Sequence, residues 1–107
     1  MPANLQASIL NDLKSLLTPA SLEQDRAVYV RCSRDWWSQT LWWDERQIQE
    51  HMPQIVARPA NAQETARLLD WANQRGIAVV PRGGGSGVSG SAIPSSRESI
   101  VIETTRL

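Results

Sequence analysis

The stretch Pro81-Arg82-Gly83-Gly84-Gly85-Ser86-Gly87-Val88-Ser89-Gly90, called the glycine loop below, contains five of the six glycines in this 107-residue chain. It follows directly on the apolar run Ile77-Ala78-Val79-Val80, which predicts a strand covered on both faces. Glycine permits positive φ and lets another atom approach the backbone closely. Successive amides in such a turn point inward and form an anion site. The stretch therefore predicts a loop that holds a phosphate or a pyrophosphate.

A strand and a helix are predicted ahead of this run. Ile55-Val56-Ala57 is a short β-prone segment, and Asn61 with Glu64 resembles a capping box at the start of a helix. Gly76 stands where that helix should end. The apolar residues expected on its buried face are Ala62, Ala66, Leu68, Leu69, Trp71 and Ala72. Together with 77–80, these segments form a βαβ unit.

The rest of the chain adds helices before this unit and a strand after it. Apolar residues recur at helical spacing over residues 4–17, and Thr18-Pro19 should end that helix. A second helix is predicted to start near Ser21. Ile100-Val101-Ile102 predicts a third strand. The fold class expected is α+β with an α/β-like βαβ unit.

Four of the five tryptophans lie within residues 36–43. A tryptophan pair can stack on a base or a flavin ring, but such a cluster more often fills a core or an interface. We therefore expect this segment to pack against a partner surface.

Composition excludes several classes of function. The formal net charge is zero, which argues against a dedicated nucleic-acid or anionic-membrane surface. Cys32 and His51 are the only residues of their types, so neither an internal disulfide nor a multi-histidine metal site is expected. We expect no secretory signal, because the N-terminus lacks a basic stretch followed by an apolar core, and no apolar run approaches the roughly 20 residues that span a bilayer. We expect a cytoplasmic protein without a transmembrane segment.

Two familiar phosphate motifs fit the glycine loop poorly. Residues 85–90 satisfy G-x-G-x-x-G, but the dinucleotide fingerprint needs a helix to begin there, and residues 91–96 are a poor helix start. A P-loop would need lysine where Ser91 stands. The favoured interpretation is a loop between two strands that binds a diphosphate through backbone amides, and the alternative is a glycine-rich hairpin or linker.

The residues of 56–59, 72–73, 76–77 and 79–90 resemble the start of the FAD-binding domain of the FAD-linked oxidases, the vanillyl-alcohol-oxidase or PCMH-type flavoproteins. This family includes glycolate oxidase flavin subunits and D-lactate dehydrogenases. The resemblance covers about residues 53–107, and it implies FAD as the cofactor. It assigns FAD binding to Pro81, Arg82, Gly83, Gly84, Gly85, Ser86, Gly87, Ser89 and Gly90. Arg82 either pairs with phosphate or takes part in a structural ion pair.

The resemblance also implies that FAD is bound non-covalently, because Ser86 stands near the place where some relatives attach the flavin through histidine. Residues 1–52 are expected to form a helical, Trp-rich extension and 53–107 the truncated front of the FAD domain. We identify no catalytic residue here, since Asp35, Glu64 and Asp70 fit turn or helix-surface charges.

Two functions follow from this interpretation. In the first, the chain is the N-terminal part of a flavin-dependent oxidoreductase acting on a 2-hydroxy acid or a similar small molecule, and the remainder of the oxidase or a complementing subunit completes it. In the second, it is a non-catalytic module that associates with a partner chain. No nucleic-acid partner is expected.

Overall fold

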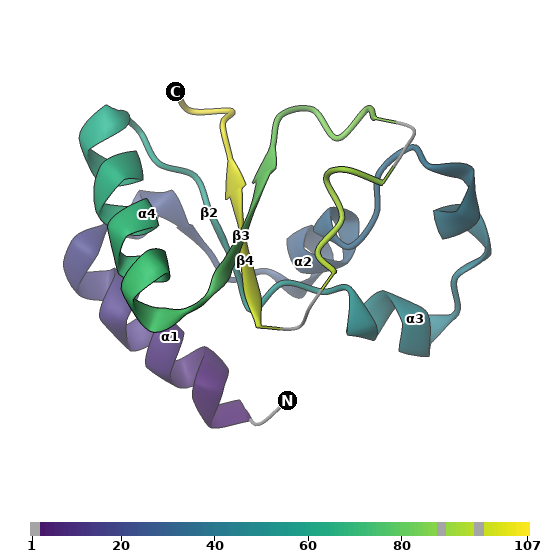
Figure 1. Ribbon diagram of the computed structural model, residues 1–107, viewed down its shortest axis with the longest axis horizontal. Helices are drawn as coiled ribbons and strands as arrows, with labels where there is room; N and C mark the ends of the chain where they lie inside the picture. The colour runs from purple at the N-terminus through teal and green to yellow at the C-terminus, as the bar shows by residue number, and fades with distance from the viewer. Residues whose placement is uncertain (1–2, 88–89, 96–97) are drawn as a thin grey trace.

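The computed structural model describes residues 3–87, 90–95 and 98–107, so Val88 and Ser89 of the glycine loop lie outside the described residues. The fold is built on one four-stranded sheet in the order β1-β2-β4-β3 (Figure 1). Strands β2 (Ile55–Ala57), β4 (Ser99–Glu103) and β3 (Ala78–Arg82) run parallel. Strand β1 (Leu22–Glu23) pairs with β2 in the antiparallel direction. The expected α+β fold with a parallel βαβ unit is confirmed.

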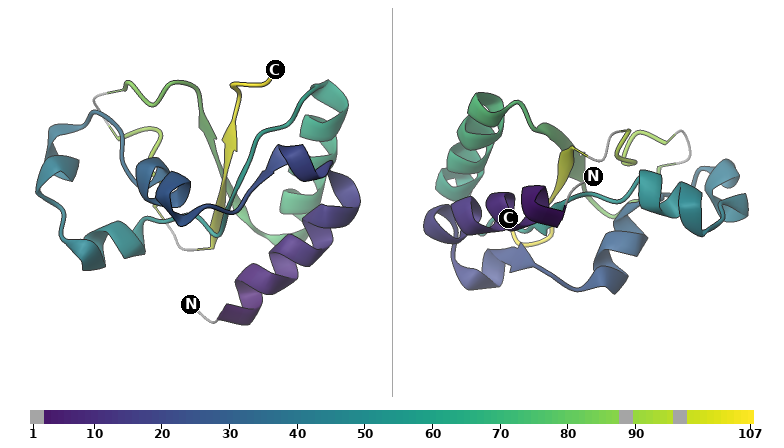
Figure 2. Two further views of the ribbon diagram at one scale, coloured as in Figure 1. Left: turned by 180° about the vertical axis from the view of Figure 1, so that it is seen from behind. Right: turned by 90° about the horizontal axis from the view of Figure 1, so that it is seen from below.

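Helices lie on both sides of the sheet. Helices α1 (Ala3–Leu16) and α4 (Ala62–Arg75) pack together on one side. Helix α2 (Arg26–Cys32) lies on the other side, and α3 (Glu45–Glu50) lies farther out beyond it (Figure 2). Two 3₁₀ helices connect them, at Pro19–Ser21 and Ser38–Trp42. The glycine loop leaves β3 on the side of α2 and α3 (Figure 1).

The core centres on β4, which lies between β2 and β3 and is buried along its whole length. Isoleucine and valine side chains of β2 and β4 there contact the buried apolar side chains of α1 and α4. Removing this apolar surface from water stabilises the fold. The expectation that the 77–80 run is covered on both faces is wrong. Strand β3 lies at the edge of the sheet, and Ala78 and Pro81 are exposed.

Helix α4 begins and ends where the sequence predicts. The Asn61 side chain accepts a hydrogen bond from the Glu64 amide, and Gly76 ends the helix with φ +66°. Its buried face, however, is rotated from the predicted one. Glu64, Leu68, Trp71 and Ala72 are buried, whereas Ala62, Ala66 and Leu69 are exposed. Apolar periodicity cannot detect this face because one of its members is a carboxylate.

Glu64 is only 3% exposed, so its assignment as a helix-surface charge is wrong. Its carboxylate accepts hydrogen bonds from the amides of Thr18 and Ala60 and from the hydroxyl of Ser21. These donors lower the pKa of the Glu64 carboxyl below its ordinary value, the Ala60 amide most of all. Asp70, by contrast, lies exposed on the helix surface as expected.

The segment after α1 differs from the sequence prediction. No helix starts at Ser21. Leu22 and Glu23 instead pair with β2, and Asp25 caps α2 through a bond from the Ala27 amide. The pairing gives the edge of β2 a partner, which local propensity does not reveal. Helix α1 forms as predicted and is held to α4 by a bond from Trp71 Nε1 to Asp12 Oδ2 at 3.0 Å.

Candidate functional site

The glycine loop begins at the carboxyl end of β3, where ligands bind in open α/β sheets. Pro81 is exposed at the edge of the sheet, a position that tolerates the missing amide of proline. The Arg82 carbonyl accepts a hydrogen bond from the Thr104 amide at 3.0 Å. The first residues of the loop are therefore fixed to the strand ladder.

The Arg82 side chain folds back beneath the loop. Its guanidinium is almost fully buried, and Nη1 donates to the carbonyl of Arg34 at 2.8 Å. A Cβ on Gly85 would lie 2.6 Å from Arg82 Cζ, and Gly85 has φ +71°. Two independent constraints thus require glycine at position 85. Among the described residues, Arg82 forms no ion pair and instead bonds to a backbone carbonyl.

The loop is fixed again at Gly87, whose carbonyl accepts a hydrogen bond from the Trp36 amide at 2.9 Å. Between these two anchors, Gly84 and Ser86 are exposed while Gly85 is buried. Within the described part of the chain, no backbone acceptor satisfies the amides of residues 84–86. Amide donors on a bare backbone at the end of a strand are the arrangement that binds an anion.

The segment Arg34–Trp37 forms a wall beside the loop. Asp35 Oδ1 accepts a hydrogen bond from the Trp37 amide at 2.8 Å, as in an Asx turn. The Trp37 ring packs against Gly90, where a Cβ would lie 3.1 Å from Trp37 Cε3. Asp35 is in a turn as expected, but it is not a surface charge, because only 8% of it is exposed.

The loop and the wall enclose a shallow cavity of about 260 Å³. The cavity is lined by Arg31, Arg34, Asp35, Trp36, Arg82, Gly84 and Gly85. Three of these residues carry guanidinium groups, which suit phosphate oxygens, although Arg31 is also ion-paired with Glu103 at 3.1 Å. The cavity therefore joins positive charge and bare backbone, and its chemistry fits a diphosphate.

The structure thus brings the predicted residues 81–87 and Gly90 together with a segment that the sequence did not connect to them. Ser89, also predicted, lies outside the described residues. Arg31 and the wall residues Arg34–Trp37 were missed because they lie more than 40 positions before the loop and match no motif. The tryptophan cluster, which predicted a partner surface, was the one available signal. No helix starts in residues 90–95; a turn closes there through a bond from the Ile93 amide to the Gly90 carbonyl.

The tryptophans of that cluster differ in their surroundings. Trp37 packs on Gly90, and Trp43 stacks on the His51 ring with a centroid separation of 4.4 Å. Trp36 and Trp42 are 69% and 85% exposed. The packing expected for the cluster therefore holds for two of the four residues within the chain.

The thiol of Cys32, the residue that follows Arg31 in the sequence, is fully buried, as expected. Burial is the main cause that raises its pKa to about 11, and its sulfur donates to Glu103 Oε1 at 3.5 Å. A thiol in this state is a poor nucleophile. Burial likewise raises the pKa of the Tyr29 phenol to about 12.

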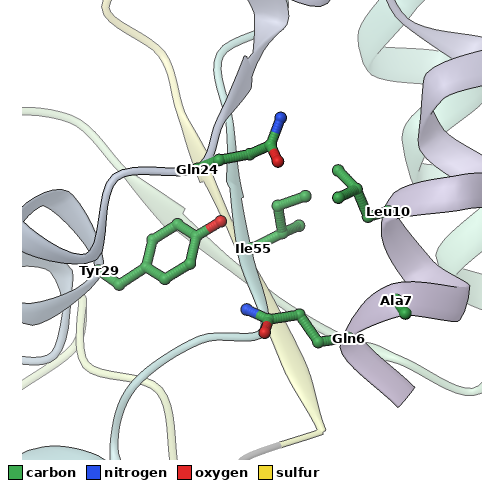
Figure 3. A pocket seen from close by; sticks show the side chains of 6 residues that line it. All are labelled: Gln6, Ala7, Leu10, Gln24, Tyr29 and Ile55. Carbon is green, nitrogen blue, oxygen red and sulfur yellow. The ribbon is translucent and has the colours of Figure 1, made fainter. Parts of the chain in front are cut away.

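A second cavity, of about 270 Å³, lies between α1 and β2 (Figure 3). Two of its polar side chains bond to the backbone: Gln6 Nε2 donates to the Gln54 carbonyl, and the Tyr29 hydroxyl donates to the Glu23 carbonyl. It shares no residue with the cavity at the glycine loop. Among the described residues, no helix has the length and apolar character needed to cross a membrane.

Comparisons with known proteins match the half of the chain that contains the glycine loop. Residues 53–107 match the family model described as FAD binding domain. D-lactate dehydrogenase of Archaeoglobus fulgidus is 42% identical over 53 residues, which are 50% of this chain and 12% of that protein. D-2-hydroxyglutarate dehydrogenase of Xanthomonas citri pv. viticola is 38% identical over 55 residues, 51% of this chain and 11% of that protein.

Among solved structures, an alkyldihydroxyacetonephosphate synthase superposes with a TM-score of 0.81 at 23% identity. The match covers 92% of this chain and 19% of the synthase. At this identity the likeness shows the fold, and it includes the N-terminal half as well as residues 53–107.

Proposed function

Because the chain belongs to the FAD-binding domain family, we propose that its glycine loop binds the diphosphate of FAD through backbone amides. The single observation that carries the proposal is the cavity lined by Gly84, Gly85 and three arginines. Arg31 in this cavity is also ion-paired with Glu103, and Arg82 donates to the Arg34 carbonyl. The residues proposed for this role are Pro81, Arg82, Gly83, Gly84, Gly85, Ser86, Gly87, Ser89 and Gly90. Pro81 fixes the entry to the loop, and Arg82 supports the backbone from below.

We propose that FAD is held without a covalent bond. Ser86 supplies only a hydroxyl at the loop. The one histidine, His51, stacks on Trp43 and places Nδ1 2.6 Å from the Pro94 carbonyl oxygen. The one cysteine, Cys32, is buried and bonded to Glu103. The side chains that could tether a flavin are thus already engaged elsewhere.

The chain spans 12% and 11% of the length of the two curated relatives described above. We propose that it forms the front of a flavin-dependent oxidoreductase, with residues 1–52 as an N-terminal extension and 53–107 as the first part of the FAD domain. A 2-hydroxy acid is the proposed substrate class, because both relatives are named for the oxidation of such acids. Bound FAD would supply the hydride acceptor. The remainder of the oxidase or a complementing subunit would supply the substrate site, and the cytoplasm is the proposed compartment.

Association with a partner chain without catalysis is the second candidate function. The observation that favours it is the exposed apolar surface of Trp36, Leu41 and Trp42, since exposed patches of this kind mark interfaces. Replacing Leu41 and Trp42 by serine should then abolish a concentration-dependent increase in mass in light scattering. An equal mass for both proteins at all concentrations would count against this candidate.

The diphosphate proposal is tested by a competition titration of the full chain with three ligands. FAD should bind, inorganic pyrophosphate should displace it, and riboflavin, which has no phosphate, should bind at least about tenfold more weakly than FAD, because the diphosphate contacts are lost. Equal affinities for riboflavin and FAD, with no effect of pyrophosphate, would exclude the loop as the diphosphate site.

A further inference from the structure

One carboxylate in the cavity has an oxygen that the fold leaves unused. Asp35 is 8% exposed, and Oδ1 is satisfied by the Trp37 amide. Oδ2 is buried and has no hydrogen-bond partner within the described residues. It lies 3.8 Å from the position that a Cβ on Gly87 would take. Most buried polar atoms are hydrogen-bonded, and one that is not calls for a partner.

The chemistry of that partner is restricted by its surroundings. An ionised carboxylate only accepts hydrogen bonds, so the partner must carry an O–H or N–H group. Arg31, Arg34 and Arg82 line the same cavity and disfavour a cation. The diphosphate of FAD is esterified on both phosphates and carries no O–H group at neutral pH, so it suits the arginines but offers no donor to Asp35. The cavity as a whole fits a ligand that carries negative charge and a hydroxyl group close together.

We propose that Asp35 positions the ligand by accepting a hydrogen bond from a hydroxyl of the sugar or polyol next to the diphosphate. The inference rests on the proposed function, which places the diphosphate at the glycine loop. It adds Asp35, which lies outside the glycine loop, and it requires the ligand to carry a hydroxyl group as well as a diphosphate. The site takes a phosphorylated sugar or polyol in preference to pyrophosphate alone. In FAD the hydroxyl comes from either the ribose or the ribityl chain.

The loop geometry supports this role. The Trp36 amide is bonded to the Gly87 carbonyl and the Arg34 carbonyl to Arg82, so the backbone on both sides of Asp35 is fixed to the loop. Trp36 lines the cavity and leaves much of its indole exposed beside the carboxylate. A flat apolar wall next to a hydrogen-bond acceptor is a common arrangement in ligand sites.

The test compares Asp35→Asn with the unaltered full chain by calorimetric titration of FAD and of inorganic pyrophosphate. Asn keeps the bond to the Trp37 amide through Oδ1 but puts an NH₂ group in place of Oδ2. We expect FAD affinity to fall at least about tenfold, since a charge-assisted hydrogen bond is lost. Pyrophosphate affinity should stay the same or rise, because a negative charge is removed. The matched control is Asp44→Asn, an exposed helix cap of the same residue type, which should change neither affinity.

A ligand-side measurement covers the case in which Asp35→Asn fails to fold. With the unaltered chain, we compare ADP with 2′,3′-dideoxy-ADP for the ribose, and FMN with an FMN analogue in which a pentyl chain replaces the ribityl chain. A loss of about tenfold without the ribose hydroxyls assigns the ribose as the source. A loss of that size for the pentyl analogue relative to FMN assigns the ribityl chain.

The inference is overturned if Asp35→Asn lowers FAD and pyrophosphate affinity by the same factor, because Asp35 then only supports the loop. It is also overturned if the two ligands of each pair bind with equal affinity. If the unaltered chain binds neither FAD nor pyrophosphate, the proposed function itself fails. These outcomes distinguish a wrong role for Asp35 from a wrong ligand.

Discussion

The guanidinium of Arg82 lies directly beneath Gly85, so that a Cβ on Gly85 would come within 2.6 Å of Arg82 Cζ. Arg82 is buried and held by the Arg34 carbonyl, so it has little freedom to move aside. Gly85 also has φ +71°. We predict that Gly85→Ala lowers the free energy of unfolding by about 1–3 kcal/mol, the range for a residue held in an unfavourable backbone conformation. Urea denaturation measures the difference.

Gly84 provides the matched control for this prediction. A Cβ on Gly84 meets nothing within 4 Å, and its φ is not positive. Gly84→Ala should change the free energy of unfolding by less than about 0.5 kcal/mol, as surface substitutions usually do. Equal effects of the two substitutions would show that Arg82 does not constrain the loop at Gly85.

Glu64 should make stability depend on pH. Its pKa is lowered from an ordinary value of 4.5 by the Ala60 amide, and next by the Thr18 amide and the Ser21 hydroxyl, against the opposing effect of burial. A depressed pKa in the folded state stabilises the fold above the unfolded pKa, and the gain is lost as the pH falls through the folded pKa. Urea unfolding between pH 6 and pH 3 should therefore show stability falling below about pH 4.5.

Glu64→Gln tests the cause of that dependence. The glutamine NH₂ group would face an amide or hydroxyl donor, so we expect a loss of about 1–3 kcal/mol at pH 7 and a weaker fall in stability at low pH. Asp70→Asn, on the exposed side of the same helix, is the control and should change stability by less than about 0.5 kcal/mol. An unchanged pH profile in Glu64→Gln would show that the carboxylate does not link the fold to pH.

Cys32 should be unreactive in the folded protein. Its pKa is raised to about 11, chiefly by burial, and the thiolate is the reactive form. At pH 8 we expect alkylation by iodoacetamide to be at least about 100-fold slower than in urea-unfolded protein, on the basis of the smaller thiolate fraction. Mass spectrometry of the labelled chain measures both rates. Comparable rates in the two states would contradict the buried position of the thiol.

The sequence predicts those parts of the fold whose signals are local. Asn61 and Gly76 mark the ends of α4, and the β-branched runs of β2 and β4 mark two of the strands. Strand β1 was missed because two residues carry no periodicity, and their pairing with β2 depends on tertiary contacts. The buried faces of α4 and β3 were also misjudged because they depend on tertiary contacts. The face of α4 includes the buried carboxylate of Glu64, and β3 lies at the edge of the sheet.

The candidate site likewise has one part that local sequence predicts and one part that depends on tertiary contacts. Glycine density identifies the loop, because the backbone conformation at Gly85 and Gly90 needs glycine. The charges that complete the cavity come from Arg31, Arg34 and Asp35, which only the folded chain brings to the loop. A single sequence assigns an aspartate such as Asp35 to the surface, since burial of an acidic residue without an ionic partner is rare.

The flavin content of the purified complete oxidase that contains this chain, released by acid precipitation, tests most directly whether the glycine loop holds FAD. We predict that the unaltered protein releases FAD into the supernatant at close to one equivalent. Gly85→Val, in which a branched side chain would meet the Arg82 guanidinium, should release little or none. Gly85→Val protein that carries FAD at the same stoichiometry as the unaltered chain would contradict the assignment of the loop to the FAD diphosphate.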